Sequence, residues 1–99
     1  MNMQALMRQA QNMQKDINKI KNEIDNTVFE GKSSLVTVSV NGKKEVLSIK
    51  FSEGVKDLID DLSMLEDMVL LALNDAFKKV DDFTNEKMGK YSNMMPGLF

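Results

Sequence analysis

The sequence predicts one α+β domain with the element order α-β-β-β-α, in which a three-stranded antiparallel sheet lies between two long helices. Three observations predict it: a heptad stripe in residues 3–24, an alternating valine run that ends in Asn41-Gly42, and a second helical pattern from residue 61 to about 90. A chain of 99 residues has room for a single hydrophobic core. The domain then divides into a helical arm at 1–26, the sheet at 27–52, the second helix at 61–90 and a tail at 91–99.

The first helix carries apolar residues at alternating spacings of three and four. They are Met3, Leu6, Ala10, Met13, Ile17, Ile20 and Ile24. This narrow stripe occupies the a and d positions of three heptads, in a segment without Gly or Pro. A helix of this extent is about 33 Å long, more than a domain this small can cover. We therefore expect the stripe to pack against another helix, of this chain or of a second one.

The middle of the chain predicts three strands. Valines alternate with polar residues over 36–40, and Asn41-Gly42 favours a two-residue hairpin turn in which both central residues have positive φ. The return strand is predicted over 45–51, and a short strand over 27–32 precedes the turn-like run at 31–34. On the return strand we expect one face to carry Leu47, Ile49 and Phe51, and the other Val46, Ser48 and Lys50.

The second helix is apolar almost all round in its middle, from Met68 to Leu73. Acidic residues at its start and lysines in its second half suit the helix dipole. A helix with such a middle needs two surfaces to pack against, and we expect these to be the sheet and a partner subunit. The residues expected at the interface of the resulting homodimer are Leu65, Met68, Val69, Leu71, Ala72 and Ala76.

Composition excludes much of enzyme chemistry. The chain has no Cys and no His, which removes disulfides, thiolate zinc sites and the commonest general base. It also lacks a Gly-rich phosphate loop, a nucleophile elbow and metal-ligand spacing. We interpret the acids between Asp57 and Asp67 as stabilising a helix N-terminus. We expect a protein that is not an enzyme, with no cofactor, no metal and no small-molecule substrate.

Nothing in the sequence predicts membrane contact. No segment approaches the roughly 18 consecutive apolar residues that a membrane span needs. The opening residues, Met1 to Gln4, lack the basic cluster and apolar core of a secretory signal. We therefore expect a cytoplasmic protein, in agreement with the absence of Cys.

The charges are distributed unevenly, although the formal net charge is only -2. With Met3 at heptad position a, Arg8 and Lys15 occupy f and Lys19 occupies c, among Gln and Asn side chains. Asp16 flanks the stripe at position g, away from this outer face. Such a face is either ordinary solvated surface or a surface that contacts phosphates. Because no aromatic residue is interleaved with the cations, the nucleic acid would be a duplex.

The tail at 91–99 contains Pro96-Gly97 and is predicted to be non-helical. Its apolar residues are Met94, Met95, Leu98 and Phe99. We expect this end either to fold back or to dock elsewhere. Together with the nine Met residues it favours an alternative function, a structural adaptor or chaperone-like dimer that grips a protein partner with its helical arms.

Five stretches of the sequence, and the order in which they follow one another, resemble the pattern of a known protein family. They are LMRQAQNMQ at 6–14, VFEGKSSLVTVSVNGKKEVLSIKF at 28–51, LEDMVLLALNDAFKKV at 65–80, EKM at 86–88 and MPGLF at 95–99. Together they span nearly the whole chain, and in this order they resemble the YbaB/EbfC family of nucleoid-associated proteins. The resemblance implies an α/β dimer whose sheets and second helices join and whose long helices project like the arms of tweezers.

The resemblance also implies a function. It implies binding of double-stranded DNA in the bacterial cytoplasm and nucleoid, with a role in nucleoid organisation or gene regulation. In the family the terminal helices are the DNA-contacting parts. The positions that inherit this role are Arg8, Lys15 and Lys19 on the first helix, and Lys78, Lys79, Lys87 and Lys90 on the second. Asp81, Asp82 and Glu86 interrupt the second group of cations.

Overall fold

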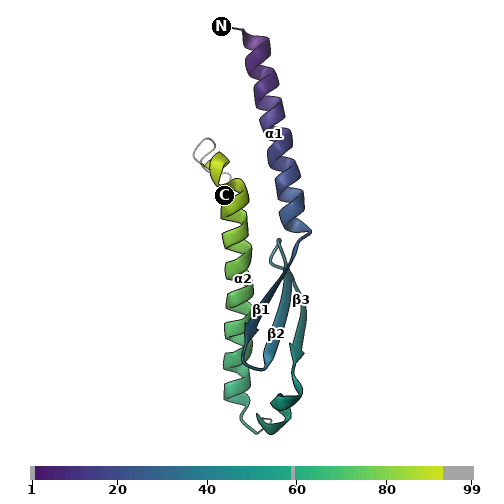
Figure 1. Ribbon diagram of the computed structural model, residues 1–99, viewed down its shortest axis with the longest axis vertical. Helices are drawn as coiled ribbons and strands as arrows, with labels where there is room; N and C mark the ends of the chain where they lie inside the picture. Colours follow the sequence, from purple (N-terminus) through teal and green to yellow (C-terminus); the bar gives the residue numbers. More distant parts are fainter. Residues whose placement is uncertain (1, 59, 93–99) are drawn as a thin grey trace.

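The computed structural model describes residues 2–58 and 60–92 and has an elongated shape of 71 × 19 × 15 Å (Figure 1). Two long helices and one antiparallel sheet follow in the predicted order α-β-β-β-α, which confirms the fold class. The elements are α1 (Met3–Asp25), β1 (Val28–Ser33), β2 (Val36–Asn41), β3 (Val46–Phe51), the 3₁₀ helix η1 (Glu53–Leu58) and α2 (Leu62–Ser92). The strand order is β1-β2-β3, so β3 has one edge that no strand among the described residues pairs.

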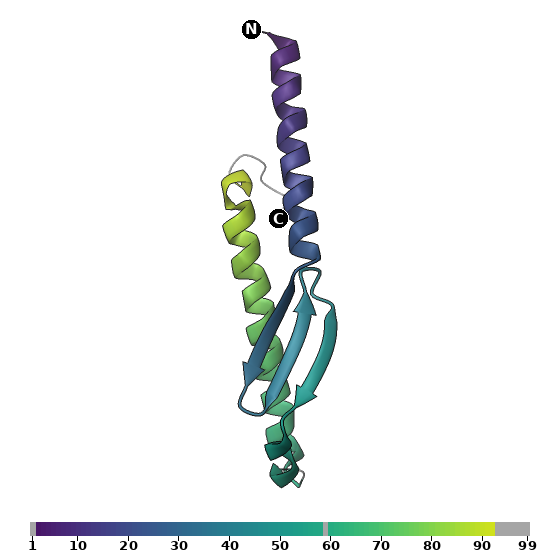
Figure 2. The ribbon, with the colours of Figure 1, turned by 45° about the vertical axis from the view of Figure 1, so that its right-hand side comes forward.

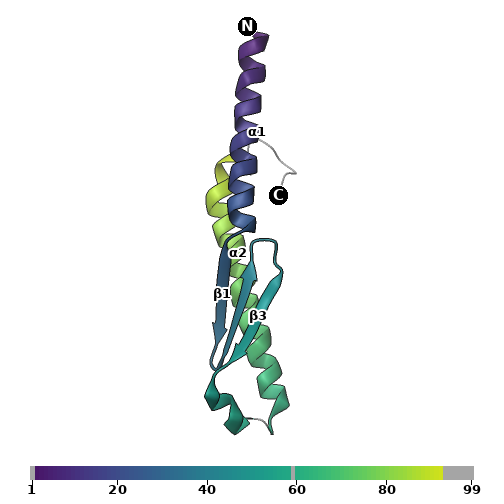
Figure 3. The same cartoon turned by 90° about the vertical axis from the view of Figure 1, so that its right-hand side faces the viewer.

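Helix α1 extends from the end of the sheet and runs alongside only the last turns of α2 (Figures 1 and 3). Ile17 and Ile24 of the heptad stripe are buried against Met88 and Tyr91 of α2. Every residue from 2 to 12 is exposed, because α1 continues beyond the end of α2. The half of the stripe nearer the sheet therefore packs against a helix of the same chain. This is one of the two alternatives expected from the sequence, the other being a helix of a second chain.

Helix α2 covers one face of the sheet, over β1 and β2. The buried core joins Phe29, Val36, Val38 and Val40 of the sheet to Ala72, Ala76 and Val80 of the helix. Small residues let the two layers approach closely at Gly31, where a Cβ atom would lie 2.1 Å from the carbonyl oxygen of Ala72. The opposite sheet face carries polar side chains such as Thr37 and Ser39 and faces solvent.

The β2–β3 turn differs from the predicted two-residue turn. The N–H of Lys44 donates to the carbonyl of Asn41 (2.9 Å), and that of Asn41 to the carbonyl of Glu45 (3.1 Å), which gives a three-residue loop. Positive φ falls on Lys44 (64°) and not on Asn41 or Gly42. Gly42 is needed instead for space, because a Cβ there would lie 1.9 Å from the carbonyl oxygen of Ile24.

A bulge in β3 changes which of its side chains share a face. Ser39 lies opposite Ser48 but Val40 lies opposite Val46, so Leu47 has no partner in β2. Directly opposed residues point to the same side of a sheet. Val46 therefore joins Ile49 and Phe51 on the side that faces α2, and its predicted placement on the other face is wrong.

Two element ends also differ from the prediction. Strand β1 extends to Ser33, and the turn that follows is confined to Ser34 and Leu35, with φ 49° at Ser34. Helix α2 continues through Ser92, because Tyr91 packs on α1 and holds the last turn in place. The apolar residues predicted for the tail lie outside the described residues.

Within residues 2–58 and 60–92, the structure contains no helix with the length and hydropathy that a membrane crossing requires.

Candidate nucleic-acid interface

The outer face of α1 presents three cations along one line. Arg8, Lys15 and Lys19 are all exposed and lie on the side of the helix opposite the heptad stripe. The rise of an α-helix places Arg8 and Lys15 about 10 Å apart along the axis, and Lys15 and Lys19 about 6 Å apart. The stripe faces α2 through Ile17 and Ile24, so this packing turns the cations outward.

No ion pair in the described part of the chain involves these three cations. Asn2 caps the N-terminus of α1 by accepting hydrogen bonds from the N–H groups of Gln4 and Ala5, at 3.0 and 3.4 Å. The first turn of α1 contains no acidic residue. A phosphate approaching Arg8 along this face therefore meets cations, amides and a helix N-terminus.

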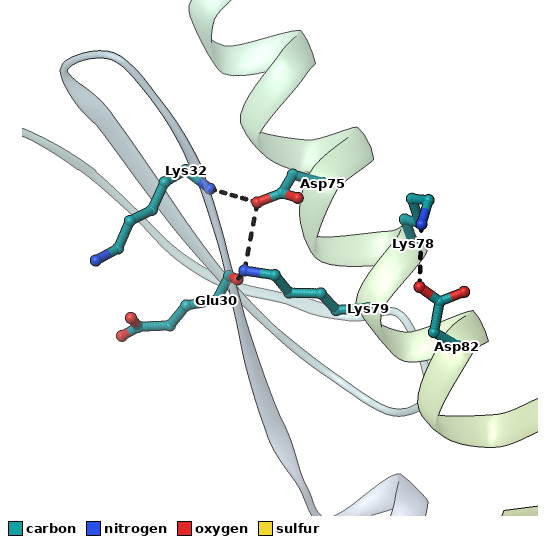
Figure 4. A network of polar contacts seen from close by, with 6 residues as sticks. All are labelled: Glu30, Lys32, Asp75, Lys78, Lys79 and Asp82. Carbon is teal, nitrogen blue, oxygen red and sulfur yellow. Dashed lines mark hydrogen bonds and ion pairs between the residues drawn. The ribbon is translucent and has the colours of Figure 1, made fainter. Parts of the chain in front are cut away.

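The lysines of α2 are differently placed, because neighbouring acids engage them. Lys78 pairs with Asp82 at 3.1 Å, and Lys79 pairs with Asp75 at 3.4 Å (Figure 4). Asp81, one helical turn from Lys78, is engaged by Lys44 of the β2–β3 turn at 2.9 Å. A phosphate at Lys78 or Lys79 would have to displace a carboxylate and remain near it, so these cations are less available than those of α1.

Lys87 and Lys90 complete the predicted set. The ammonium group of Lys87 lies 5.4 Å from the ring centre of Phe83, a cation–π contact that leaves the side chain half-buried. The side chain of Lys90 lies outside the described residues.

Asp75 ties α2 to the edge strand of the sheet. Its carboxylate accepts a hydrogen bond of 3.0 Å from the backbone N–H of Lys32, and Lys79 donates to the carbonyl of Glu30 at 2.7 Å (Figure 4). The Lys32 N–H, aided by the charge of Lys79 and opposed by desolvation, lowers the pKa of Asp75 from its ordinary value. This group therefore supports the fold and is not aimed at a ligand.

We expect Asp75→Asn to destabilise the protein in a pH-dependent way. A lowered pKa in the folded state gives stability that is fully present above the ordinary Asp value of about 4, and that is lost as pH falls through the lowered value. The difference in unfolding free energy between wild type and variant should shrink from pH 6 to pH 3, measured by urea denaturation. The exposed α2 acid Asp67, changed to Asn, serves as the control and should show no comparable trend.

An open apolar face lies between α2 and β3. We define it as Val46, Ile49 and Phe51 of β3 with Leu65, Val69, Leu70 and Leu73 of α2. The β3 residues oppose the buried valines of β2, yet Ile49 keeps 44% of its surface exposed because α2 lies over β1 and β2. The α2 residues, together with Glu66, line an open groove on the flank away from Asp75, and Leu70 is 57% exposed.

The residues predicted for a dimer interface fall on different sides of α2. Ala72 and Ala76 are fully buried against Gly31 in the core of this chain, so their predicted contact with a partner is corrected. Met68 is partly buried on the same core, and Leu71 is exposed on the side away from the sheet. Leu65 and Val69 line the groove of the open apolar face. Leu70 and the β3 residues of this face are not among the residues predicted for the interface.

A family model described as the YbaB/EbfC DNA-binding family matches residues 1–95. The chain belongs to the YbaB/EbfC DNA-binding family. This confirms the resemblance found in the sequence, and the family is not a known enzyme family.

Relatives within the YbaB/EbfC family match along almost their whole length. A nucleoid-associated protein of Ligilactobacillus salivarius is 45% identical, over 99% of this chain and 95% of the relative. One of Bacillus licheniformis is 51% identical, over 99% and 94%. One of Streptococcus thermophilus is 42% identical, over 97% and 98%.

A solved structure shares the fold of this YbaB/EbfC chain. The crystal structure of an uncharacterized protein from Helicobacter pylori aligns with a TM-score of 0.70, over 96% of this chain and 99% of that one. Its sequence identity of 24% makes the likeness one of fold alone.

Proposed function

We propose that this protein binds double-stranded DNA as a homodimer, mainly through the outer face of α1, with low sequence specificity. The family is one of DNA-binding proteins, and its nucleoid-associated relatives support a role in organising the nucleoid or regulating genes, in the cytoplasm of a bacterium.

The observation that carries the proposal is the contrast between the two helices. Arg8, Lys15 and Lys19 point outward and form no ion pair with any described residue, whereas Lys78 and Lys79 are paired with carboxylates. Free cations displace counterions from DNA when they contact phosphates, and this is the source of sequence-independent affinity. The cations of α1 therefore supply most of the binding, and Lys78, Lys79, Lys87 and Lys90 add to it.

Low specificity follows from the side chains that α1 offers. Phosphate contacts position a protein on DNA but do not distinguish bases. The outer face contains one arginine, the residue that most often reads guanine in the major groove, and no aromatic residue. We therefore propose recognition of the duplex backbone.

A second copy of this chain is the proposed occupant of the open apolar face. Strand β3 has one unpaired edge, and exposed apolar side chains stand next to it, an arrangement that soluble proteins cover. Pairing of this edge and groove with the same surface of another copy gives a two-fold assembly. Two arms would then act on one duplex, and the number of phosphate contacts would double.

The experiment that tests the proposal removes the three cations of α1. We expect Arg8→Ala, Lys15→Ala and Lys19→Ala, combined, to weaken binding to unrelated duplexes by at least about tenfold at low salt. Loss of about three phosphate contacts per arm should also reduce the slope of log affinity against log salt by about 2.7 per arm. Fluorescence anisotropy in a salt series measures both quantities.

A charge-matched variant serves as the control for net charge. Lys32, Lys50 and Lys56 are exposed lysines on and beyond the sheet, and changing them to Ala removes the same charge elsewhere. We expect little loss of affinity in this variant. Equal losses in the two triple variants would contradict a role for α1, and no binding by wild type at low salt would contradict DNA binding itself.

A second candidate function is favoured by the tip of α1. Met3 is 66% exposed and Leu6 46%, and Met7, 59% exposed, lies next to them on the same end of α1. Exposed Met and Leu on a helix suit an adaptor or chaperone-like dimer that holds a protein partner. Changing Met3 and Leu6 to Gln separates the two functions, because DNA binding should survive this change and protein binding should not.

A further inference from the structure

The turn between β2 and β3, residues 41–45, lies directly at the C-terminal end of α1 (Figure 2). A Cβ atom on Gly42 would lie 1.9 Å from the carbonyl oxygen of Ile24 and 2.4 Å from its carbonyl carbon. Any residue larger than Gly at this position must therefore displace the backbone of either the turn or the helix. The turn and the last turn of α1 are in backbone contact.

The turn itself is held in one shape by Asn41. The side-chain oxygen of Asn41 accepts hydrogen bonds from the N–H groups of Lys43 and Glu45, both at 3.0 Å. Its amide nitrogen donates to the carboxylate of Glu45 at 2.8 Å. Two backbone hydrogen bonds also join Asn41 to residues 44 and 45. Together these contacts hold the turn in one conformation.

The same turn is anchored to α2. Lys44, at the position with positive φ, extends its ammonium group to within 2.9 Å of the carboxylate of Asp81. The turn thus touches α1 through Gly42 and α2 through Lys44, and it connects the two helices where they begin to run alongside each other.

The direction of α1 is also constrained by its packing on α2, where Ile17 and Ile24 are buried against Met88 and Tyr91. Two residues, Asn26 and Thr27, link α1 to β1, and their side chains bond back to the helix carbonyls of Asn22 (2.9 Å) and Glu23 (2.6 Å). A cavity of about 190 Å³, lined by residues of α1 and α2 and by Gly42, adjoins the junction. Gly42 lines this cavity, and its backbone contact with Ile24 adds to the constraint that the α1–α2 packing places on the direction of α1.

We propose that the 41–45 turn is a positioning element that sets the direction of the DNA-binding arm, with Gly42 and Lys44 as its positioning residues. The inference rests on the proposed function of α1. A helix of 23 residues is about 34 Å long, so a tilt of about 10° at its base moves its tip by about 6 Å. Such a shift separates Arg8 from a phosphate that a correctly directed arm would reach.

Arm direction is measured first, without DNA. The chain contains no Cys, so Cys introduced at exposed Gln11 and Glu30 can be spin-labelled, and dilution with unlabelled chain isolates distances within one copy. Gly42→Ala should shift the distance by several ångström relative to wild type. Gly89→Ala is the matched control, because a Cβ at Gly89 meets no atom within 4 Å, and it should leave the distance unchanged.

Duplex affinity is measured next on the same variants. Gly42→Ala should bind at least about tenfold more weakly although every cation is retained, whereas Gly89→Ala should bind like wild type. An unchanged distance in Gly42→Ala, or a changed distance with wild-type affinity, would overturn the inference. If wild type itself fails to bind DNA, the proposed function fails, while the distances still test whether the turn directs the arm.

A second, milder variant tests the same inference if Gly42→Ala does not fold. Asp81→Asn releases Lys44 and keeps every cation, and both partners of this ion pair are about half exposed, so the fold should tolerate the change. We expect a broader distance distribution and weaker DNA binding. If Asp81→Asn binds more tightly than wild type with an unchanged distribution, the pair acts only through charge and the inference fails.

Discussion

Gly31→Ala is expected to cause the largest loss of stability in the chain. The new methyl group would lie 2.1 Å from the carbonyl oxygen of Ala72 and 2.4 Å from the backbone nitrogen of Ala76, and neither backbone atom can move alone. Helix α2 must then separate from β1 along the most closely packed part of the core. Overpacking of this kind costs about 3 kcal/mol or more, a large fraction of the stability of a small domain. Thermal unfolding at fixed protein concentration should show a midpoint roughly 12 °C lower or more.

The control is Gly89→Ala, which makes the same change of residue type at a position of α2. At Gly89 an added Cβ meets no atom within 4 Å, and Ala is the better helix former by about 1 kcal/mol. Gly89→Ala should therefore be neutral or slightly stabilising. If Gly31→Ala unfolds at the same temperature as wild type, the close approach of α2 to β1 is not as described.

Ile49→Asp is expected to convert the proposed homodimer to a monomer. Ile49 belongs to the open apolar face and lies opposite buried Val38, and the proposed two-fold interface would bury both copies of the new carboxylate. An uncompensated buried charge costs about 3–5 kcal/mol, which raises the dimer dissociation constant at least about a hundredfold. Light scattering coupled to size-exclusion chromatography measures the mass directly.

Lys50→Asp is the matched control for this experiment. Lys50 is the next residue on the same strand, and its side chain points to the polar face of the sheet, so the introduced acid remains in water. We expect this variant to keep the wild-type mass. Leu70→Asp, in the α2 part of the open apolar face, should reproduce the effect of Ile49→Asp. A wild-type mass for both apolar-face variants would place the dimer contact elsewhere and leave DNA binding by α1 to be tested separately.

Much of the fold follows from periodicity alone. The heptad stripe fixes the length of α1 and the side that meets α2, and the alternating valines of β2 identify both the strand and its buried face. Such patterns are local and can be read along the chain. The requirement for Gly42 is not local, because it depends on Ile24 of α1. The β3 bulge lies within one hairpin, but the alternating pattern does not indicate that Leu47 has no partner in β2.

The candidate site was only partly predictable for the same reason. Heptad register places Arg8, Lys15 and Lys19 outward without knowledge of any contact. The availability of Lys79 to a ligand depends on its hydrogen bond to the carbonyl of Glu30, 49 positions earlier in the chain. No sequence pattern predicts that bond. Likewise, the all-apolar run from Met68 to Leu73 does not show which of its residues faces β1, solvent or a partner.

The unsupported tip of α1 has a consequence for how the arm meets its ligand. Residues 2–12 are exposed throughout, so only capping and intrinsic helix propensity keep them helical, whereas Lys15 and Lys19 lie along the part of α1 that α2 braces. Isolated helices of this length fray in water. On the proposed function, a phosphate bound at Arg8 would stabilise the helical state of the tip, so the end of α1 would gain order when the arm binds DNA.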